Sequence, residues 1–209
     1  MQTMEVGLAG ENTAEAIIEP ELNLLPEETE MLAQVYAGAS RILEYGVGGT
    51  TVLAARSTDA ELLSIECDED AASRMTGYLE KADLLTDQVR IHWEYIGPTK
   101  KWGYPADQSR WRRYPEYALA PWESFKFRPD VVTINGRFRL ACFAATMMFC
   151  KAPTTVLFAD YANRDAYHAV SQFVKPSKVS GRMAKFIVEP SKVKGKEFST
   201  LVRWFFLLK

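Results

Sequence analysis

The chain has 209 residues, enough for one ordinary domain with a buried core. Hydrophobic residues make up 47% and charged residues 25%, the balance of a soluble globular protein. A formal net charge of −2 argues against a protein built wholly to bind nucleic acid, although it leaves room for a local basic patch.

The cysteines are Cys67, Cys142 and Cys150, widely spaced and without a C-x-x-C pair. Neither a disulfide framework nor a zinc site is therefore expected. The acidic N-terminus carries no basic segment followed by an apolar core, and no apolar run approaches the roughly 20 residues of a membrane span. We expect a protein of the reducing cytoplasm that makes no membrane contact.

Residues 1–25 form an acidic, weakly patterned lead-in, and residues 26–209 are expected to form a single domain. A helix is predicted from Pro26, because proline suits a first helical turn and Glu27 and Glu28 favour the positive end of a helix dipole. Gly38 is a plausible stop.

After this helix, short apolar runs alternate with helical stretches. The apolar runs are Arg41–Tyr45, Leu62–Cys67, Val89–Tyr95, Val131–Asn135 and Thr155–Ala159. The helical stretches are Thr50–Arg56, Glu69–Ala82, Leu140–Phe149 and Arg164–Phe173. This alternation predicts a parallel sheet with helices on both faces. The tail breaks the alternation with two β-rich runs, Met183–Glu189 and Ser199–Leu208, which predict an antiparallel hairpin.

The segment Ile42–Thr51 is the most informative part of the chain. It places Glu44 near the end of an apolar strand, Gly46 and Gly48 in the turn, and Thr50 at the start of a helix. Glycines allow a tight turn and let a ligand approach the backbone. A pyrophosphate-binding loop would carry a third glycine where this chain has Thr51. An acidic residue before the loop suits a ligand with an ammonium group instead, and the alternative is a tight turn that binds no ligand.

This E-x-G-x-G loop resembles the first motif of class I S-adenosylmethionine-dependent methyltransferases. The resemblance extends, at the level of strand order, over residues 26–209. It implies an α/β, Rossmann-like three-layer sandwich with a mostly parallel seven-stranded sheet, order 3-2-1-4-5-7-6, ending in a C-terminal antiparallel hairpin. It also implies S-adenosylmethionine as cofactor, with Glu44, Gly46, Gly48 and Thr50 around its methionine part.

A second carboxylate, Glu66, ends the next strand 22 residues after Glu44. At this spacing a carboxylate reaches the ribose hydroxyls of a nucleoside bound over the first loop, and the resemblance points to the same position. Cys67 would lie along the adenine edge, and Tyr95, at the end of the third strand, is expected near the adenine. A solvated carboxylate at a strand end is the alternative for Glu66.

A long insertion at about 98–127 combines aromatic and basic residues, among them Trp102 and Trp111. One interpretation is a lid over the acceptor whose arginines recognise a carboxylate or phosphate. The others are base stacking on RNA and an insertion that packs on the domain or on a second copy.

The acceptor site of this topology lies beyond the strand ends at the switch in strand order. The expected catalytic residues there are Asn135, Asp160 and His168, with Asp160 as the leading candidate for a base. Substrate contacts are expected from Arg137, Arg139, Tyr161, Trp102 and Trp111.

The strand ends have some likeness to catechol-type O-methyltransferases, which bind magnesium there. This chain has Asn135 where that family has aspartate, and Tyr161 where it has asparagine. One carboxylate and one amide make a poor magnesium site, so no metal is expected.

The predicted function is methyl transfer to a small-molecule acceptor, with RNA as the alternative partner. A methyltransferase-like domain that binds cofactor or RNA without catalysis is the alternative function. An NAD-dependent oxidoreductase is disfavoured by Thr51 in place of the third glycine.

Overall fold

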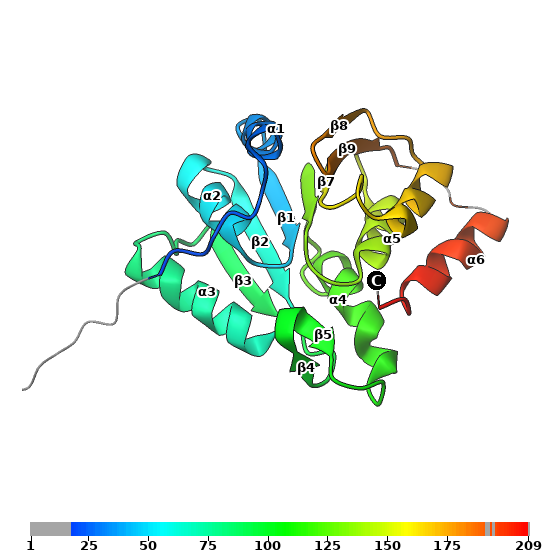
Figure 1. Ribbon diagram of the computed structural model, residues 1–209, viewed down its shortest axis with the longest axis horizontal. Coiled ribbons are helices and arrows are strands. Elements are labelled where there is room, and N and C mark those ends of the chain that lie inside the picture. The colour runs from blue at the N-terminus through cyan, green and yellow to red at the C-terminus, as the bar shows by residue number, and fades with distance from the viewer. Residues whose placement is uncertain (1–17, 191–192, 194, 209) are drawn as a thin grey trace, which may run out of the picture.

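The computed structural model describes residues 18–190, 193 and 195–208 of the chain. Most of the predicted lead-in, and part of the connection after Glu189, lie outside these residues. Figure 1 shows a twisted central sheet with helices packed against both faces.

Seven strands form the central sheet, in the order β3-β2-β1-β6-β7-β9-β8. They are β1 (Arg41–Tyr45), β2 (Glu61–Glu66), β3 (Val89–Trp93), β6 (Val131–Ile134), β7 (Thr154–Phe158), β8 (Lys178–Ser180) and β9 (Met183–Val188). The first five are parallel, and β9 runs antiparallel to both β7 and β8. When only these strands are numbered along the chain, the order is 3-2-1-4-5-7-6, which confirms the predicted topology.

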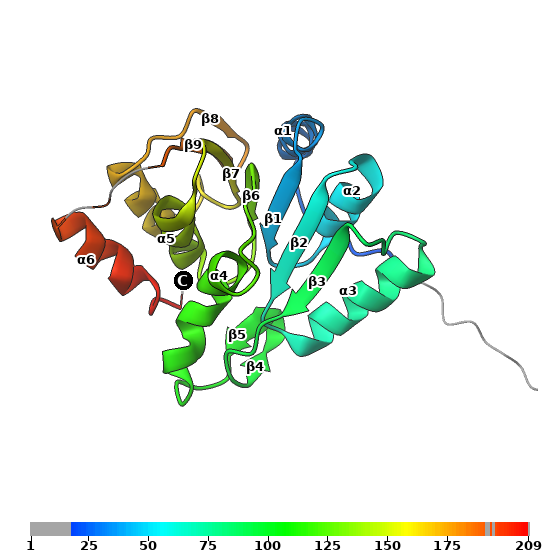
Figure 2. The ribbon, with the colours of Figure 1, turned by 180° about the vertical axis from the view of Figure 1, so that it is seen from behind.

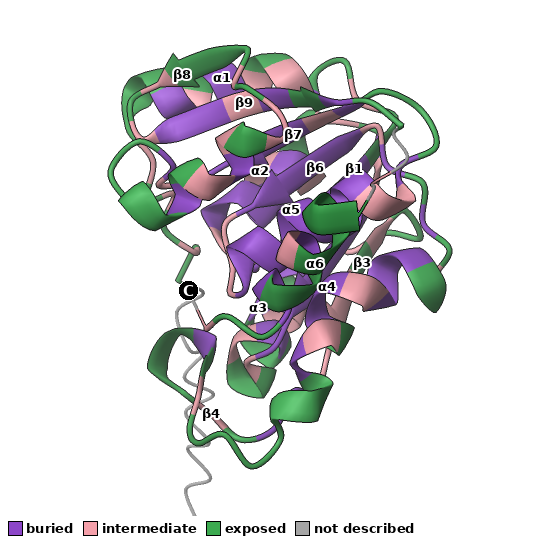
Figure 3. Ribbon diagram, turned by 90° about the vertical axis from the view of Figure 1, so that its right-hand side faces the viewer, coloured by how far each residue is buried: buried purple, intermediate pink, exposed green. Residues whose placement is uncertain are grey.

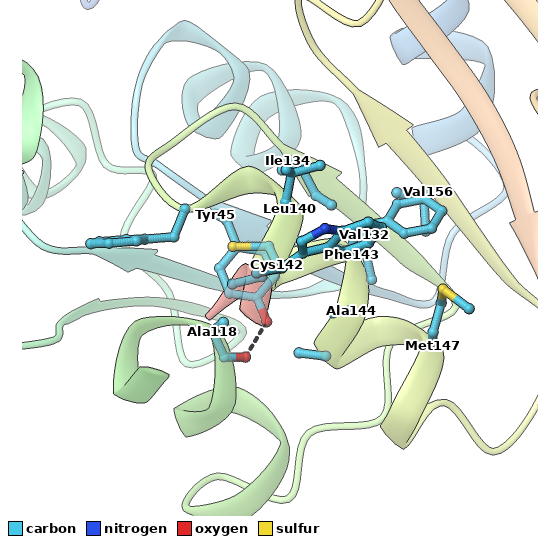
Figure 4. Close-up of a cluster of buried hydrophobic side chains, with 14 of the residues drawn as sticks. Tyr45, Ala118, Val132, Ile134, Leu140, Cys142, Phe143, Ala144, Met147 and Val156 are labelled. Carbon is cyan, nitrogen blue, oxygen red and sulfur yellow. Dashed lines mark hydrogen bonds between the residues drawn. The ribbon is translucent and has the colours of Figure 1, made fainter. Parts of the chain in front are cut away.

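Successive residues of the inner strands face opposite layers, as the two-residue period of a strand requires. Leu43 and Leu63 pack with α4 (Tyr114–Glu123) and α5 (Arg139–Phe149), whereas Ile42 and Leu62 pack with α1 (Pro26–Tyr36) and α2 (Gly49–Ser57). Figure 4 shows the first of these clusters, in which the Tyr45 hydroxyl donates a hydrogen bond of 2.7 Å to the carbonyl of Ala118. The sheet is therefore covered on both sides, as predicted.

The remaining elements extend these two layers. Helix α3 (Glu69–Lys81) lies beside β2 and β3, and α6 (Gly195–Trp204) lies against α5 at the other end of the molecule (Figures 1 and 2). A 3₁₀ helix, η3 (Asp165–Gln172), replaces the helix expected over 164–173. Figure 3 shows β6 and β7 buried in the interior, whereas β8 and much of α6 are exposed.

The antiparallel hairpin exists, but one of its predicted strands was wrong. The partner of β9 is the short strand β8, which precedes it in the chain, whereas the predicted strand Ser199–Leu208 forms most of α6. Its buried residues Leu201, Trp204 and Phe205 follow the spacing of one helix face. This helical period outweighed the β-propensity on which the strand prediction depended. Strand β8 is three residues long and largely exposed, so it has little apolar pattern to find.

The insertion at about 98–127 is more ordered than a loop. Its first part is a small hairpin of β4 (Thr99–Lys100) and β5 (Tyr104–Pro105), joined by the 3₁₀ turn η1 (Lys101–Gly103). A second 3₁₀ turn, η2 (Trp111–Arg113), leads into α4. Helix α4 belongs to the core: Tyr117 is fully buried and Trp122 almost so. No helix was predicted here; one proline of α4 stands in its first turn, where proline is tolerated, and Pro121 lies inside the helix.

Candidate active site

The glycine loop connects β1 to α2, and its two turn glycines are needed for different reasons. Gly46 has φ +94°, and a Cβ there would lie 2.4 Å from the Cα of Gly136 in the loop after β6. Gly48 is extended, and a Cβ there would meet no heavy atom within 4 Å. Gly46 therefore lets two loops pass closely, whereas Gly48 leaves open space above the turn.

Glu44 lies beneath this loop, not on its surface. Its carboxylate is fully buried and accepts hydrogen bonds from the hydroxyls of Thr50, Thr51 and Ser64, the last two at 2.6 Å. The Thr51 hydroxyl in turn accepts from the backbone N–H of Gly48 at 3.0 Å. Glu44 thus holds the start of α2 in place, and a direct contact with a ligand would require these bonds to break.

Burial raises the pKa of Glu44 to about 6, although the three hydroxyl donors oppose the shift. Because the folded-state pKa lies above the unfolded value, the folded protein binds more protons between pH 4.5 and 6. This group therefore lowers the free energy of unfolding as the pH rises through that window, by on the order of 2 kcal/mol.

A Glu44→Gln variant should lose this pH dependence, because glutamine does not titrate. Urea denaturation at pH 4.5 and at pH 7 measures this effect. On going from pH 4.5 to pH 7, we expect the free energy of unfolding of the wild type to lose about that amount relative to the variant. Glu61→Gln, at the exposed start of β2, is the matched control. Equal pH dependence in Glu44→Gln and the wild type would contradict the assignment.

Glu66 stands at the end of β2, as predicted, and is 8% exposed. Its carboxylate accepts from three backbone N–H groups: Val47 at 3.1 Å, Cys67 at 2.7 Å and Asp68 at 2.9 Å. Burial raises its pKa against the effect of these donors. The bond from Val47 ties the second carboxylate to the glycine loop.

The turn η1 covers Glu66 and Cys67. The Cys67 thiol lies 3.5 Å from the Gly103 carbonyl, and a Cβ on Gly103 would lie 3.5 Å from a Glu66 oxygen. Trp102 and Gly103 both have positive φ, at 68° and 69°. A left-handed conformation is costly for a bulky residue such as tryptophan and is found most often at functional sites.

A cavity of about 550 Å³ opens over the glycine loop, and Trp102 forms part of its wall. It is lined by Pro20–Leu24, Val47–Thr50, Trp102, Asn135, Arg137, Arg139, Asp160, Arg164 and Arg182. Among the predicted site residues, the structure thus brings together Gly48, Thr50, Trp102, Asn135, Arg137, Arg139 and Asp160. A second cavity of about 590 Å³, between the start of α3 and the 98–102 segment, is also bordered by Trp102.

Sequence reasoning missed three parts of the cavity wall: the segment 20–24, Arg164 and Arg182. Gly49 packs so closely on Leu22 that a Cβ would lie 2.5 Å from the Leu22 Cα. Leucines in an otherwise acidic segment were the one available signal that the lead-in packs on the domain. Arg182 is brought in by the turn before β9, far along the chain, and no local pattern marks it.

Arg139 joins the ends of two strands and is almost fully buried. Its guanidinium donates to the carbonyls of Asn135, Gly136 and Ala159 at 3.1, 3.0 and 2.6 Å. Burial lowers its pKa. It also lies 3.1 Å from Asp160, whose carboxylate is 3.1 Å from Arg164 and 3.9 Å from Arg182. Asp160 is therefore the shared counter-ion of three guanidinium groups.

Eight predicted residues do not line the cavity: Glu44, Gly46, Glu66 and Cys67, which lie in, beneath or beside the loop, and Tyr95, Trp111, Tyr161 and His168. Tyr161 is mostly buried and shares a 2.6 Å hydrogen bond with Ser171, and the ring of His168 packs on it with centroids 4.8 Å apart. Trp111 packs against Phe206, and Tyr95 lies beneath the guanidinium of Arg113.

Two further features concern the described part of the chain. No group of three or more His, Cys, Asp or Glu side chains with the proximity of a metal site occurs among residues 18–190 and 195–208. No helix among those same residues combines the length and apolar character that crossing a membrane would demand.

The sheet order and the glycine loop define the Rossmann-like fold of class I methyltransferases. No protein-family model and no curated protein sequence matches the chain. A solved methyltransferase-like protein from Silicibacter pomeroyi is 41% identical, with a TM-score of 0.83 over 90% of this chain and 98% of that one. The chain belongs to the family of this methyltransferase-like protein, and its fold is that of class I S-adenosylmethionine-dependent methyltransferases.

More distant structures share the fold alone. An O-methyltransferase from Bacillus cereus, solved with SAH, is 17% identical with a TM-score of 0.57, over 81% of this chain and 84% of that one. An RNA methyltransferase from Salinibacter ruber, solved with S-adenosyl-L-homocysteine, is 14% identical with a TM-score of 0.51, over 83% and 97%. One is named for RNA as its acceptor and the other only for methyl transfer to oxygen, so the fold does not decide the acceptor class.

Proposed function

We propose that the protein transfers a methyl group from S-adenosylmethionine to a small-molecule acceptor. The observation that carries the proposal is the placement of Glu66 beside the glycine loop, with a polar cavity directly over that loop. Membership in a methyltransferase-like family supports the same reaction.

The residues at this edge of the sheet fit the proposed cofactor. The Glu66 carboxylate would accept from the ribose hydroxyls, and the open backbone at Gly48 would receive the methionine part. Glu44 would position this loop from below. When bound, S-adenosylmethionine would supply an electrophilic methyl group on its sulfonium.

The turn η1 must move for this site to fill. It covers Glu66, and Trp102 separates the cavity over the glycine loop from the cavity beside α3. Glu66 lines neither cavity, so a ribose could reach its carboxylate only after a movement of η1. We therefore propose that η1 is a gate over the nucleoside end of the site, not a lid over the acceptor.

The acceptor would occupy the part of the cavity near Asn135 and Asp160. These residues would orient it, because positioning supplies much of the acceleration in a displacement reaction. The Asp160 carboxylate is the proposed recipient of a proton lost by an oxygen or amine acceptor. A cavity of about 550 Å³ suits a small molecule. The packing of Trp111 on Phe206 leaves less of that ring for stacking on RNA.

Thermal shift with S-adenosylmethionine, S-adenosylhomocysteine and NAD tests the proposed cofactor. A ligand at about a hundred times its Kd stabilises the fold by about 2.7 kcal/mol, which raises Tm by several degrees. We expect this response to both adenosyl ligands, none to NAD, and loss of the response in Glu66→Ala.

If Glu66→Ala unfolds, Glu66→Gln is the second variant, because its amide oxygen still accepts from the backbone N–H groups. Glu61→Ala, at the exposed start of the same strand, should respond like the wild type. No response to either adenosyl ligand in the folded wild-type protein would refute the proposed function.

A further inference from the structure

The cavity over the glycine loop contains more guanidinium groups than carboxylates can neutralise. Its walls carry Arg137, Arg139, Arg164 and Arg182. We propose that it binds an anionic acceptor, one that bears a carboxylate or a phosphate, through Arg137 and Arg164. This inference rests on the proposed methyl transfer and names the substrate class.

Two of the four arginines already use most of their N–H donors in hydrogen bonds and ion pairs within the protein. Arg139 holds three backbone carbonyls at the ends of β6 and β7. Arg182 forms a two-point ion pair with Glu28, at 2.8 and 3.0 Å, and donates to the Asn23 carbonyl at 3.1 Å. Glu28 is 1% exposed, so this pair is internal to the fold. These two arginines shape the cavity and have little capacity left for a ligand.

Arg137 and Arg164 are the arginines with free capacity. The guanidinium of Arg137 stacks over the Tyr104 ring at 4.2 Å, and no carboxylate of the described residues lies within 4.0 Å of it. Arg164 is 45% exposed, and its one carboxylate partner, Asp160 at 3.1 Å, is shared with Arg139 and Arg182. Both side chains line the cavity, so a ligand there meets N–H donors that are not fully used by partners within the protein.

The charge balance favours an anion as the ligand. The acidic groups against the four arginines are Asp160 and Glu21 in the cavity wall and Glu28 behind Arg182. One positive charge is therefore left over, and Arg137 is the arginine without an acidic partner. The amino end of α2 also faces the cavity and adds its positive dipole.

The geometry of Arg137 suits recognition of a planar or tetrahedral anion. A guanidinium presents paired N–H donors that match carboxylate and phosphate oxygens. Stacking on Tyr104 restricts the orientation of the side chain, so less entropy is lost when the donors engage a ligand. Tyr104 belongs to the hairpin that carries η1, so the anion site borders the proposed gate.

The same chemistry could serve two sources of anion: an acceptor, or the carboxylate of the cofactor itself. The probe that separates them is inorganic phosphate, titrated at constant ionic strength and followed by thermal shift, with and without saturating S-adenosylhomocysteine. We expect a saturable rise of Tm that persists when S-adenosylhomocysteine is bound.

Arg137→Gln and Arg164→Gln should each raise the apparent Kd for phosphate by about tenfold, because each removes charge-assisted hydrogen bonds. The affinity for S-adenosylhomocysteine, measured by calorimetry, should change little in either variant. Arg41→Gln is the matched control: it removes the same charge from the exposed start of β1, at the opposite edge of the sheet.

Two results would overturn the inference. One is a phosphate response equal in all variants, which would identify nonspecific binding. The other is a response abolished by S-adenosylhomocysteine, together with weaker S-adenosylhomocysteine binding in both variants, which would assign the arginines to the cofactor. If phosphate binds at Arg137 and Arg164 but S-adenosylhomocysteine does not bind the wild type, the anion site stands and the proposed cofactor fails.

Discussion

A Gly103→Cys variant, oxidised to form a disulfide with Cys67, should lose S-adenosylhomocysteine binding. A Cβ on residue 103 would lie 3.0 Å from the Cys67 sulfur, close enough for the two cysteines to join with little backbone movement. The bond would hold η1 over Glu66, so the proposed gate could not open. We expect the affinity to fall by more than about tenfold, equivalent to 1.4 kcal/mol.

Calorimetry before and after reduction measures this effect in one preparation. Reduction should restore binding, and Cys67→Ser in the Gly103→Cys background should make the variant insensitive to oxidant. Cys142 and Cys150 are buried elsewhere in the core and should not react. Gly103→Ala controls for the cost of a side chain at φ +69°. Undiminished binding by the fully oxidised variant would show that η1 need not move.

Gly46→Ala should destabilise the protein far more than Gly48→Ala, although the two residues stand in one turn. At Gly46 a Cβ would enter the backbone of Gly136, at 2.4 Å, and would also force a side chain into a left-handed conformation. We expect the free energy of unfolding to fall by at least about 3 kcal/mol. At Gly48 the backbone is extended and the space is open, so the loss should stay within about 1 kcal/mol.

Ligand binding should distinguish the same pair of variants. The new methyl group of Gly48→Ala would project into the cavity over the loop, so we expect a folded protein with S-adenosylhomocysteine affinity reduced several-fold. Urea denaturation gives the stabilities and calorimetry gives the affinities. Equal stabilities for the two variants would contradict the close approach of the loops at Gly46 and Gly136.

The sequence alone determined the five parallel strands of the sheet. The alternation of apolar strands with amphipathic helices specifies parallel strands covered on both faces, and all five parallel strands occur within two residues of their predicted ends. Glu66 at the end of β2 was predictable for the same reason, since the residue that ends a parallel strand must lie at the carboxyl edge. The glycine loop was identified from local chemistry, because glycines and a following helix start are short-range signals.

Tertiary packing decided the role of each site residue. The composition of the E-x-G-x-G loop cannot show whether Glu44 points up to a ligand or down to hydroxyls. Ser64, which is 20 residues away, completes the buried set of donors. Likewise, the need for glycine at position 46 comes from Gly136 on another loop. The ion pairs of Asp160 come from arginines in α5, just before η3 and in the turn before β9.

The tail and the insertion show the limit of local patterns most clearly. The sequence after Glu189 carries both β-propensity and a helical stripe, and packing of Leu201 and Trp204 against the core selects the helix. The position of η1 over Glu66 depends on contacts between Gly103 and Cys67, 36 residues apart in the chain. The positions of the parallel strands follow from local periodicity. Burial and long-range contacts depend on which surfaces meet, and only the folded chain contains that information.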